Sequence, residues 1–227
     1  MLTLAIDCSA RFCASALYRA GEDRVLAAAS PDIGRGHAEH LPSIVQSVLV
    51  EAQIELQQVD RIGVTIGPGS FAGIRVGVAF ARGLALALDV PAIGVGALEA
   101  IAVPAARQAG NAVMAVLDAR RERVWAIVVA ADGAVVRAGA ELTPQAAAAL
   151  ALETGCAIIG SGASQLAAVD LSLQSHILDR PVAPRIEDVA RLAARLDPDR
   201  NPAEPRYLRE ADAKPQTGFA VPHQAVV

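Results

Sequence analysis

The chain has 227 residues, of which 53% are hydrophobic, 19% are charged and only 3% are aromatic, which is enough material for one large or two small domains. A formal net charge of −4 and the scarcity of stacking aromatics argue against a protein that binds nucleic acid on its own. The three cysteines form no CxxC pair, which argues against a zinc knuckle or a disulfide framework and favours a reducing compartment.

The sequence carries no targeting signal that we recognise. The N-terminus has no basic region ahead of an apolar run, so no signal peptide is expected. The longest apolar stretch, Val76 to Leu88, contains Arg82 and is shorter than the roughly 20 residues of a membrane span. We therefore expect a cytoplasmic protein without a membrane partner.

The first half of the sequence predicts the order strand, strand, strand, helix, strand, helix, strand. Short apolar runs bounded by turn residues predict strands at residues 2–7, 13–18, 25–29, 61–66 and 91–95. His37–Ala52 is predicted to be an amphipathic helix, because its apolar residues recur at helical spacing. A second helix is expected from about Ala72 to Leu88.

The second half repeats this order in outline. Strands are expected at residues 112–117, 124–129, 134–137 and 156–159. Thr143 and Pro144 mark a helix start as N-cap and first helical residue, and that helix is expected to end near Gly155. A last amphipathic helix is predicted at Ile186–Leu196.

A duplicated three-strand meander with alternating helices predicts an α/β fold of two tandem ribonuclease-H-like domains, as in actin, Hsp70 and sugar kinases. The second domain is expected to be smaller and less regular. We predict domains at residues 1–100 and 101–197, with the boundary near Gly96–Gly110. Residues 198–227 are rich in proline and charge, so we expect a tail that wraps the surface or is disordered, at least beyond Arg209.

Enzymes of this architecture hold ATP between the two halves, on hairpins in which a glycine lets backbone N–H groups approach phosphate. Here the hairpins beginning at Asp7 and Asp118 contain the aspartate but no glycine. Both loops therefore look unsuited to clamping phosphate, and the two aspartates are interpreted mainly as turn anchors. Gly160 and Gly162 follow a strand and could either border an adenosine pocket or simply join the strand to a helix. Together these four residues mark a possible degenerate nucleotide cleft.

The most specific stretch is GPGSFAGIRVG at residues 67–77, which joins a strand to the second helix. Its glycines permit unusual backbone angles, and its serine can cap the helix. Such a helix start can bind an anion, although a turn that packs strand and helix closely would need the same residues. The motif residues singled out are Gly67, Pro68, Gly69, Ser70, Phe71, Gly73 and Arg75.

The helix after this turn is apolar on nearly all sides, so it must be buried on more than one side. From Ile74 to Leu88 its only charged residues are Arg75 and Arg82. We expect this helix and the helix at residues 37–52 to form a subunit interface, unless the chain's own core covers them. The candidate interface residues are Leu41, Ile44, Val45, Val48, Arg75, Val78, Ala79 and Arg82.

With these motifs the chain resembles the bacterial TsaB family, also called YeaZ. The matching segments are LAIDCS at residues 4–9, HAEHLP at 37–42, the glycine-rich stretch at 67–77, IGV at 93–95, LDAR at 117–120 and PRYLR at 205–209. The resemblance therefore spans almost the whole chain, to about Arg209. Ala72 is a departure, because the family usually has threonine at this position.

The resemblance implies a non-catalytic subunit that binds and activates a TsaD-type catalytic subunit, which installs threonylcarbamoyl on N6 of adenosine 37 in ANN-decoding tRNAs. It also implies a TsaE-type ATPase as a further partner, metal and ATP held by the partners, and tRNA contact only through the complex. Arg206 and Arg209 could neutralise a phosphate or a partner carboxylate. In isolation we expect a homodimer formed by the same apolar helices. No residue is predicted to be catalytic or to bind a metal.

Two alternatives belong to other functional classes. A metallohydrolase is suggested by His37 and His40, which share a helix face, but zinc proteases use HExxH with a third ligand. An ATP-dependent small-molecule kinase of the same fold would need glycine-bearing phosphate loops, and neither hairpin has one.

Overall fold

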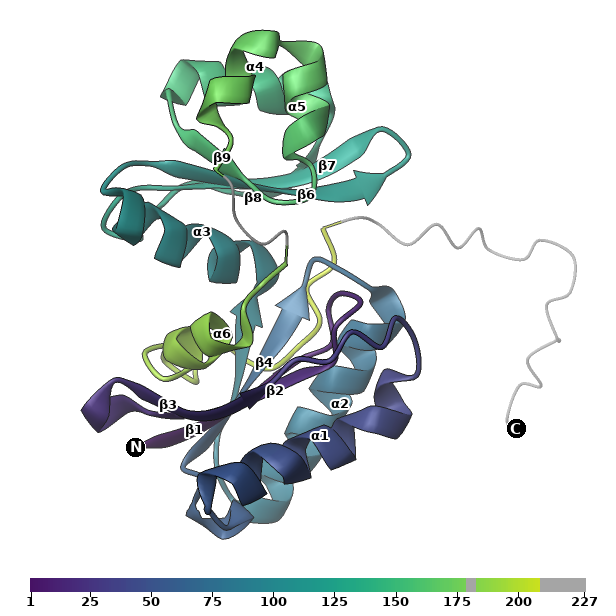
Figure 1. Cartoon of the computed structure of the whole chain (residues 1–227), viewed down its shortest axis with the longest axis vertical. Helices are drawn as coiled ribbons and strands as arrows, with labels where there is room; N and C mark the ends of the chain where they lie inside the picture. The colour runs from purple at the N-terminus through teal and green to yellow at the C-terminus, as the bar shows by residue number, and fades with distance from the viewer. Residues whose placement is uncertain (179–182, 209–227) are drawn as a thin grey trace, which may run out of the picture.

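The computed structural model describes residues 1–178 and 183–208, which form two β-sheets with helices on both faces of each (Figure 1). The first sheet has the order β3-β2-β1-β4-β5, and the second has the order β8-β7-β6-β9. In each sheet an antiparallel three-strand meander is extended by strands that pair in parallel. The predicted fold class of two tandem ribonuclease-H-like units, the second smaller, is confirmed.

The strands of the first sheet are β1 (Leu2–Asp7), β2 (Ala14–Arg19), β3 (Arg24–Ala29), β4 (Arg61–Gly67) and β5 (Ala92–Gly96). Those of the second sheet are β6 (Val113–Arg120), β7 (Arg123–Val129), β8 (Val135–Leu142) and β9 (Ala157–Ile159). Each lies within a few residues of its predicted range, except that β8 extends to Leu142, five residues beyond its predicted end.

The helices form the outer and inner layers around these sheets (Figure 1). Helices α1 (His37–Ala52) and α2 (Phe71–Leu88) cover the outer face of the first sheet, whereas α4 (Pro144–Thr154) and α5 (Ala163–Val169) cover the outer face of the second. Between the sheets lie α3 (Ala97–Ala109) and α6 (Ile186–Ala193). Short 3-10 turns occupy Ala20–Glu22, Leu56–Gln58 and Leu171–His176.

Helix α3 occupies the stretch near which the domain boundary was predicted, Gly96–Gly110. Gly96 and Gly110 are its two caps, and most of the residues between them are buried. The buried side packs on β6 and β7 of the second sheet. The helix thereby covers the inner face of that sheet.

Helix α6 corrects the predicted 101–197 domain, because it belongs to the first half. Ile186, Val189 and Ala190 pack with residues of β1 and β2. A Cβ atom on Gly63 of β4 would collide with the side chain of Ala193. The chain therefore returns to the first sheet after completing the second.

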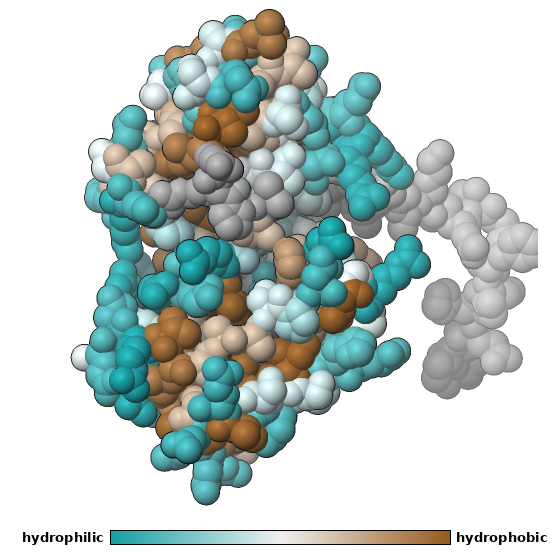
Figure 2. Space-filling model, viewed as in Figure 1, coloured by the Kyte–Doolittle hydropathy of each residue, from teal (hydrophilic) through white to brown (hydrophobic). Residues whose placement is uncertain are grey.

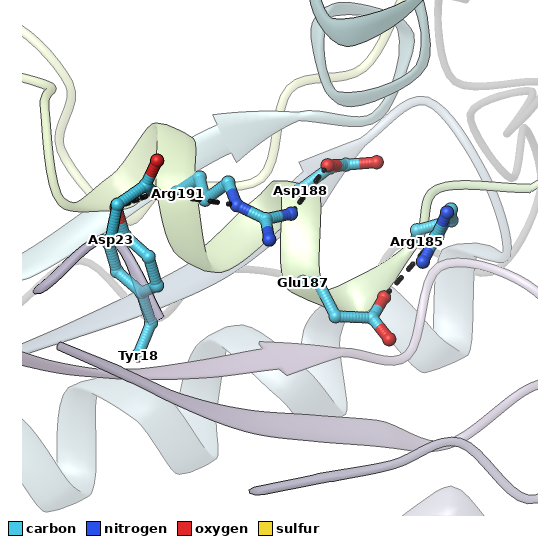
Figure 3. A network of polar contacts seen from close by, with 6 residues as sticks. All are labelled: Tyr18, Asp23, Arg185, Glu187, Asp188 and Arg191. Carbon is cyan, nitrogen blue, oxygen red and sulfur yellow. Dashed lines mark hydrogen bonds and ion pairs between the residues drawn. The ribbon is translucent and has the colours of Figure 1, made fainter. Parts of the chain in front are cut away.

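Polar contacts fasten α6 to the first sheet (Figure 3). Arg191 lies 3.2 Å from Asp188 on its own helix and 3.8 Å from Asp23, which follows the short turn after β2. On the other side, Arg61 Nη1 donates to the carbonyl oxygens of Ala193 and Leu196, at 3.0 and 3.1 Å. These contacts fix where α6 ends.

Residues 198–208 form a strap over the ends of β4 and β5. The N–H of Gly94 donates to the carbonyl oxygen of Asn201 at 2.8 Å, and the N–H of Arg206 donates to that of Ile66 at 2.8 Å. Ala203 joins the first core. The first part of the predicted tail thus wraps the surface, while its remainder, Arg209 included, lies outside the described residues.

Candidate functional site

In the first hairpin of the possible nucleotide cleft, the carboxylate of Asp7 is engaged in hydrogen bonds within the chain. Asp7 is buried, and its Oδ1 accepts from the N–H of Ser9 at 2.8 Å and from the hydroxyl of Thr65 at 2.6 Å. A carboxylate satisfied in this way anchors the turn and ties β1 to β4. The arrangement agrees with the turn-anchor interpretation of Asp7.

The glycine-rich motif packs on this same hairpin. The N–H of Ser70 donates to the carbonyl oxygen of Ser9 at 2.7 Å, and the Ser70 hydroxyl caps α2 by accepting from the N–H of Gly73 at 3.2 Å. A Cβ atom on Gly69 or Gly73 would collide with the carbonyl groups of the hairpin. The motif therefore packs the turn closely against residues 8 and 9.

Gly67 and Pro68 lie beneath the strap. Gly67 has φ +116°, a conformation that L side chains rarely adopt, and a Cβ atom there would lie 2.7 Å from the carbonyl oxygen of Arg206. Pro68 is buried beside it. This glycine is needed for both the turn and the strap that crosses it.

The second hairpin gathers Asp118, Gly160 and Gly162 at the end of β6. The N–H of Asp118 donates to Ser161 Oγ at 3.0 Å, and Asp118 Oδ1 accepts from the N–H of Arg120 at 2.7 Å. Cβ atoms on the two glycines would collide with Val116 of β6. These glycines let the turn pack against a strand, so the plain connection is the better interpretation.

The two histidines of the metallohydrolase alternative differ in their surroundings. His37 is buried, and its Nε2 lies 3.0 Å from the carbonyl oxygen of Ala10 and 3.1 Å from that of Phe12. Because carbonyl oxygens only accept, Nε2 carries the proton and donates. His40 is exposed. Among residues 1–178 and 183–208, no three His, Cys, Asp or Glu side chains are grouped to hold a metal ion.

The predicted interface residues divide into a buried and an exposed set. The four α1 candidates were predicted at an interface unless the chain's own core covers them, and the first core does cover them; they are Leu41, Ile44, Val45 and Val48. Val78 on α2 is buried for the same reason. Arg75, Ala79 and Arg82 are exposed.

The exposed residues of α2 form a continuous stripe at helical spacing. We call Ala72, Arg75, Ala79, Arg82 and Leu86 the α2 stripe. Leu86 has 85% of its surface exposed, and the two alanines leave the helix backbone open to close approach. In the view of Figure 2, hydrophobic surface shows over the half that carries α1 and α2. A surface hollow of about 670 Å³ adjoins the end of the stripe; Arg82, Leu86 and Val90 are among its lining residues.

An aromatic cluster covers the N-terminal end of the stripe. The Arg75 guanidinium lies 3.8 Å from the ring centroid of Phe71, and Arg75 Nε donates to the hydroxyl of Tyr207 at 3.0 Å. The two rings stand 5.3 Å apart, and both side chains are about half exposed. Tyr207 was not predicted as a site residue. Because only 3% of the residues are aromatic, the presence of Phe71 and Tyr207 could have drawn attention to this surface.

Arg206, the strap residue predicted to neutralise a phosphate or a partner carboxylate, pairs within the chain. Its Nη1 contacts Glu99 Oε1 of α3, so it neutralises this chain's own carboxylate in place of a phosphate or a partner group. The second oxygen of Glu99 is buried without a hydrogen-bond partner. Arg206 thus links the strap to the helix between the two sheets.

Helix α2 is longer than the apolar stretch recognised in the sequence, because it begins at Phe71. By length and composition alone it could cross a membrane, and within the described ranges it is the one helix that could. A core helix of a soluble protein satisfies the same criterion. Its packed side lies against the first sheet, so this is weak evidence for a membrane span.

Comparison with known proteins relates the chain to a family. Residues 31–156 match the family model described as TsaD, tRNA N6-adenosine threonylcarbamoyltransferase. A solved structure described as similar to the peptidase YeaZ, from Pseudomonas aeruginosa, shares 30% identity with a TM-score of 0.75, covering 92% of this chain and 99% of that one. The tRNA threonylcarbamoyladenosine biosynthesis protein TsaB of Escherichia coli is 35% identical over 126 residues. The chain belongs to the TsaB family.

Other proteins match along more of the chain. An uncharacterized protein of Mycobacterium tuberculosis is 33% identical over 218 residues, 93% of each chain. The structure titled YeaZ from Pseudomonas aeruginosa is 29% identical with a TM-score of 0.70, covering 91% of this chain and all of that one. The match to the Escherichia coli TsaB covers 55% of this chain and only 53% of that protein, so the chain matches about half the length of that curated relative.

Proposed function

We propose that this chain is a non-catalytic partner subunit that binds a TsaD-type catalytic subunit through the α2 stripe. In this role it supports the transfer of threonylcarbamoyl to N6 of adenosine 37 in ANN-decoding tRNAs. The observation that carries the proposal is the exposed stripe of alanine, arginine and leucine side chains on a helix whose other side is core. Exposed apolar side chains interspersed with arginine are typical of a protein–protein contact.

The composition of the stripe suits docking. Leu86 is almost fully exposed, and burying such a side chain contributes about 1.5–3 kcal/mol. Ala72 and Ala79 allow a partner helix to approach closely, and Arg75 and Arg82 supply directional contacts, since arginine is enriched at interface hot spots. The aromatic cluster of Phe71 and Tyr207 extends the surface at one end.

We assign no catalytic residue to this chain, because the residues of the possible nucleotide cleft already have structural partners within it. Asp7 is satisfied by Ser9 and Thr65, and the glycines at residues 160 and 162 pack on β6. Curated relatives are named as threonylcarbamoyladenosine biosynthesis proteins, and the matching family model is named for the transferase. Both names are consistent with a supporting subunit in the same pathway.

The complex would assemble in the cytoplasm. The TsaD-type subunit would supply metal and a TsaE-type ATPase would use ATP, and tRNA would be held by the complex. Without a partner, the α2 stripe would pair with its copy on a second chain, because an isologous dimer buries the same apolar surface.

Calorimetric titration of a TsaD-type subunit with purified variants tests the docking. Leu86→Asp and Arg82→Glu are each expected to weaken binding by about 2 kcal/mol or more, which is roughly 30-fold. Arg137→Glu reverses an exposed charge on β8, in the other half, and should leave the affinity unchanged. Wild-type affinity in both stripe variants would refute the proposed docking surface.

A further inference from the structure

Two thiols face one another across the first hairpin. Cys8 and Cys13 directly follow β1 and precede β2, one step beyond the opposed pair Asp7 and Ala14. Their sulfur atoms lie 3.9 Å apart, both side chains are buried, and both thiols are free. The third cysteine, Cys156, lies in the core of the second half.

We propose that Cys8 and Cys13 are an oxidative modification site: peroxide converts them to an intrachain disulfide, and this bond weakens docking at the α2 stripe. The second part of this inference rests on the proposed function, whereas the first part does not.

The geometry needs a small adjustment to form the bond. A disulfide holds its sulfurs about 2.05 Å apart, so the gap must close by about 1.9 Å. Cys8 and Cys13 stand one residue beyond the last paired residues of β1 and β2, where the two chain segments of a hairpin are still near the Cβ separation that a disulfide requires. Rotation of the two side chains with a slight tightening of the hairpin supplies this movement.

The thiols are electrostatically unequal. The hydrogen bond between the two sulfur atoms, in which either thiol can donate, lowers the pKa of Cys13 and raises the pKa of Cys8. The thiolate is the reactive form of cysteine. We assign Cys13 as the sulfur that attacks the oxidant and Cys8 as the resolving thiol; because both side chains are buried, peroxide reaches them through local opening of the hairpin.

The reaction balances with hydrogen peroxide as the oxidant. The Cys13 thiolate attacks one peroxide oxygen, the O–O bond breaks, and the leaving hydroxide takes up a proton to become water. The product is a sulfenic acid on Cys13. The Cys8 sulfur then attacks the Cys13 sulfur, the S–O bond breaks, and a second water leaves. Two thiols lose two electrons and two protons, and one peroxide is reduced to two waters.

The oxidised hairpin would disturb the starts of both outer helices. The carbonyl group of Cys8 packs against Gly73, and the side chain of Cys8 lies beside Gly77 of α2. On the other side, the Cys13 sulfur lies 4.0 Å from the carbonyl oxygen of His37, the first residue of α1. Drawing Cys8 toward Cys13 loosens its packing against α2, on the helix that carries the stripe.

Peptide mapping of the full chain tests the modification itself. After treatment with hydrogen peroxide and capping of free thiols, the wild-type protein should yield Cys8 and Cys13 in one linked species, lighter by two hydrogens and restored by reductant. Cys156→Ser should retain this species, and Cys8→Ser or Cys13→Ser should lack it. Recovery of both cysteines as free thiols, as separate oxidised acids or in bonds between chains would overturn the inference, whether or not the serine variants fold.

Titration of a TsaD-type subunit with the reduced and oxidised chains tests the consequence. The oxidised wild type should bind about tenfold more weakly, within the usual range of coupling between sites, and peroxide-treated Cys8→Ser should show no such loss. Equal binding by the reduced and oxidised chains would overturn the coupling. Failure of the reduced chain to bind at all would instead refute the proposed function, and the mapping result would stand.

Discussion

Gly73 on α2 lies directly against the carbonyl group of Cys8, with no space between them for a side chain. This contact presses the first turn of the helix onto the hairpin that follows β1. The same hairpin is held on its other side by His37, at the start of α1. The loop that follows β1 is therefore a packing junction for both outer helices.

Replacing Gly73 with alanine should destabilise the protein by about 1–3 kcal/mol, because the new methyl group overpacks this contact. Urea unfolding followed by circular dichroism measures the loss. Gly83→Ala is the matched control: a Cβ atom there meets nothing within 4 Å, and alanine favours a helix by about 1 kcal/mol over glycine. A Gly73→Ala protein as stable as the wild type would show that the junction tolerates a side chain.

The helices that could be predicted best were those whose ends are marked locally. Gly36 and Gln53 bound α1 where the periodicity indicated, and Thr143 caps α4 through the N–H of Ala146. Helix α6 was found in the sequence but assigned to the wrong half, because its amphipathic pattern does not say which sheet its apolar side covers.

The candidate site was predicted only in part, for a related physical reason. Helical spacing identified Leu41 and Val48 as one apolar face, yet the same pattern describes a core face and an interface equally well. Ala79 and Arg82 were predicted at an interface, and both are exposed on α2; their role there stays a prediction. The pairing of Arg206 with Glu99 joins residues far apart in sequence, so no local pattern could indicate it.

His37 should matter for stability and not for metal binding. His37→Ala removes the donor to the Ala10 and Phe12 carbonyl groups, and should cost about 1–3 kcal/mol in unfolding free energy. The exposed His40→Ala should change it by no more than about 0.5 kcal/mol. A metallohydrolase would behave differently: a rise in melting temperature with zinc that both variants abolish would revive that alternative.

The pair of Tyr18 and Asp23 should make stability depend on pH (Figure 3). The Tyr18 hydroxyl donates to Asp23 at 2.6 Å, and this hydrogen bond lowers the pKa of Asp23 below its ordinary value of 3.8. A carboxyl group with a lowered folded-state pKa contributes stability above its unfolded-state pKa, and the contribution is lost as pH falls through the folded-state value.

Tyr18→Phe should therefore be less stable than the wild type at pH 7, and the difference should shrink as the pH falls below about 4. Urea unfolding at a series of pH values measures this difference in stability. Tyr207→Phe is the control, because the Tyr207 hydroxyl accepts a hydrogen bond from Arg75 and not from an acidic group. A difference that stays constant from pH 7 to pH 2 would mean that the lost contact is not charge-dependent.

We propose above all that this chain acts by enabling a catalytic partner. The most direct measurement is threonylcarbamoyladenosine formation on tRNA by a TsaD-type subunit, with its TsaE-type ATPase and a threonylcarbamoyl-adenylate donor, in the presence and absence of the chain. We predict a large rise in product when the wild-type chain is added, little rise with Leu86→Asp, and no product from the chain alone. Product formation that does not depend on the chain, or that the chain supports without its partner, would contradict this account.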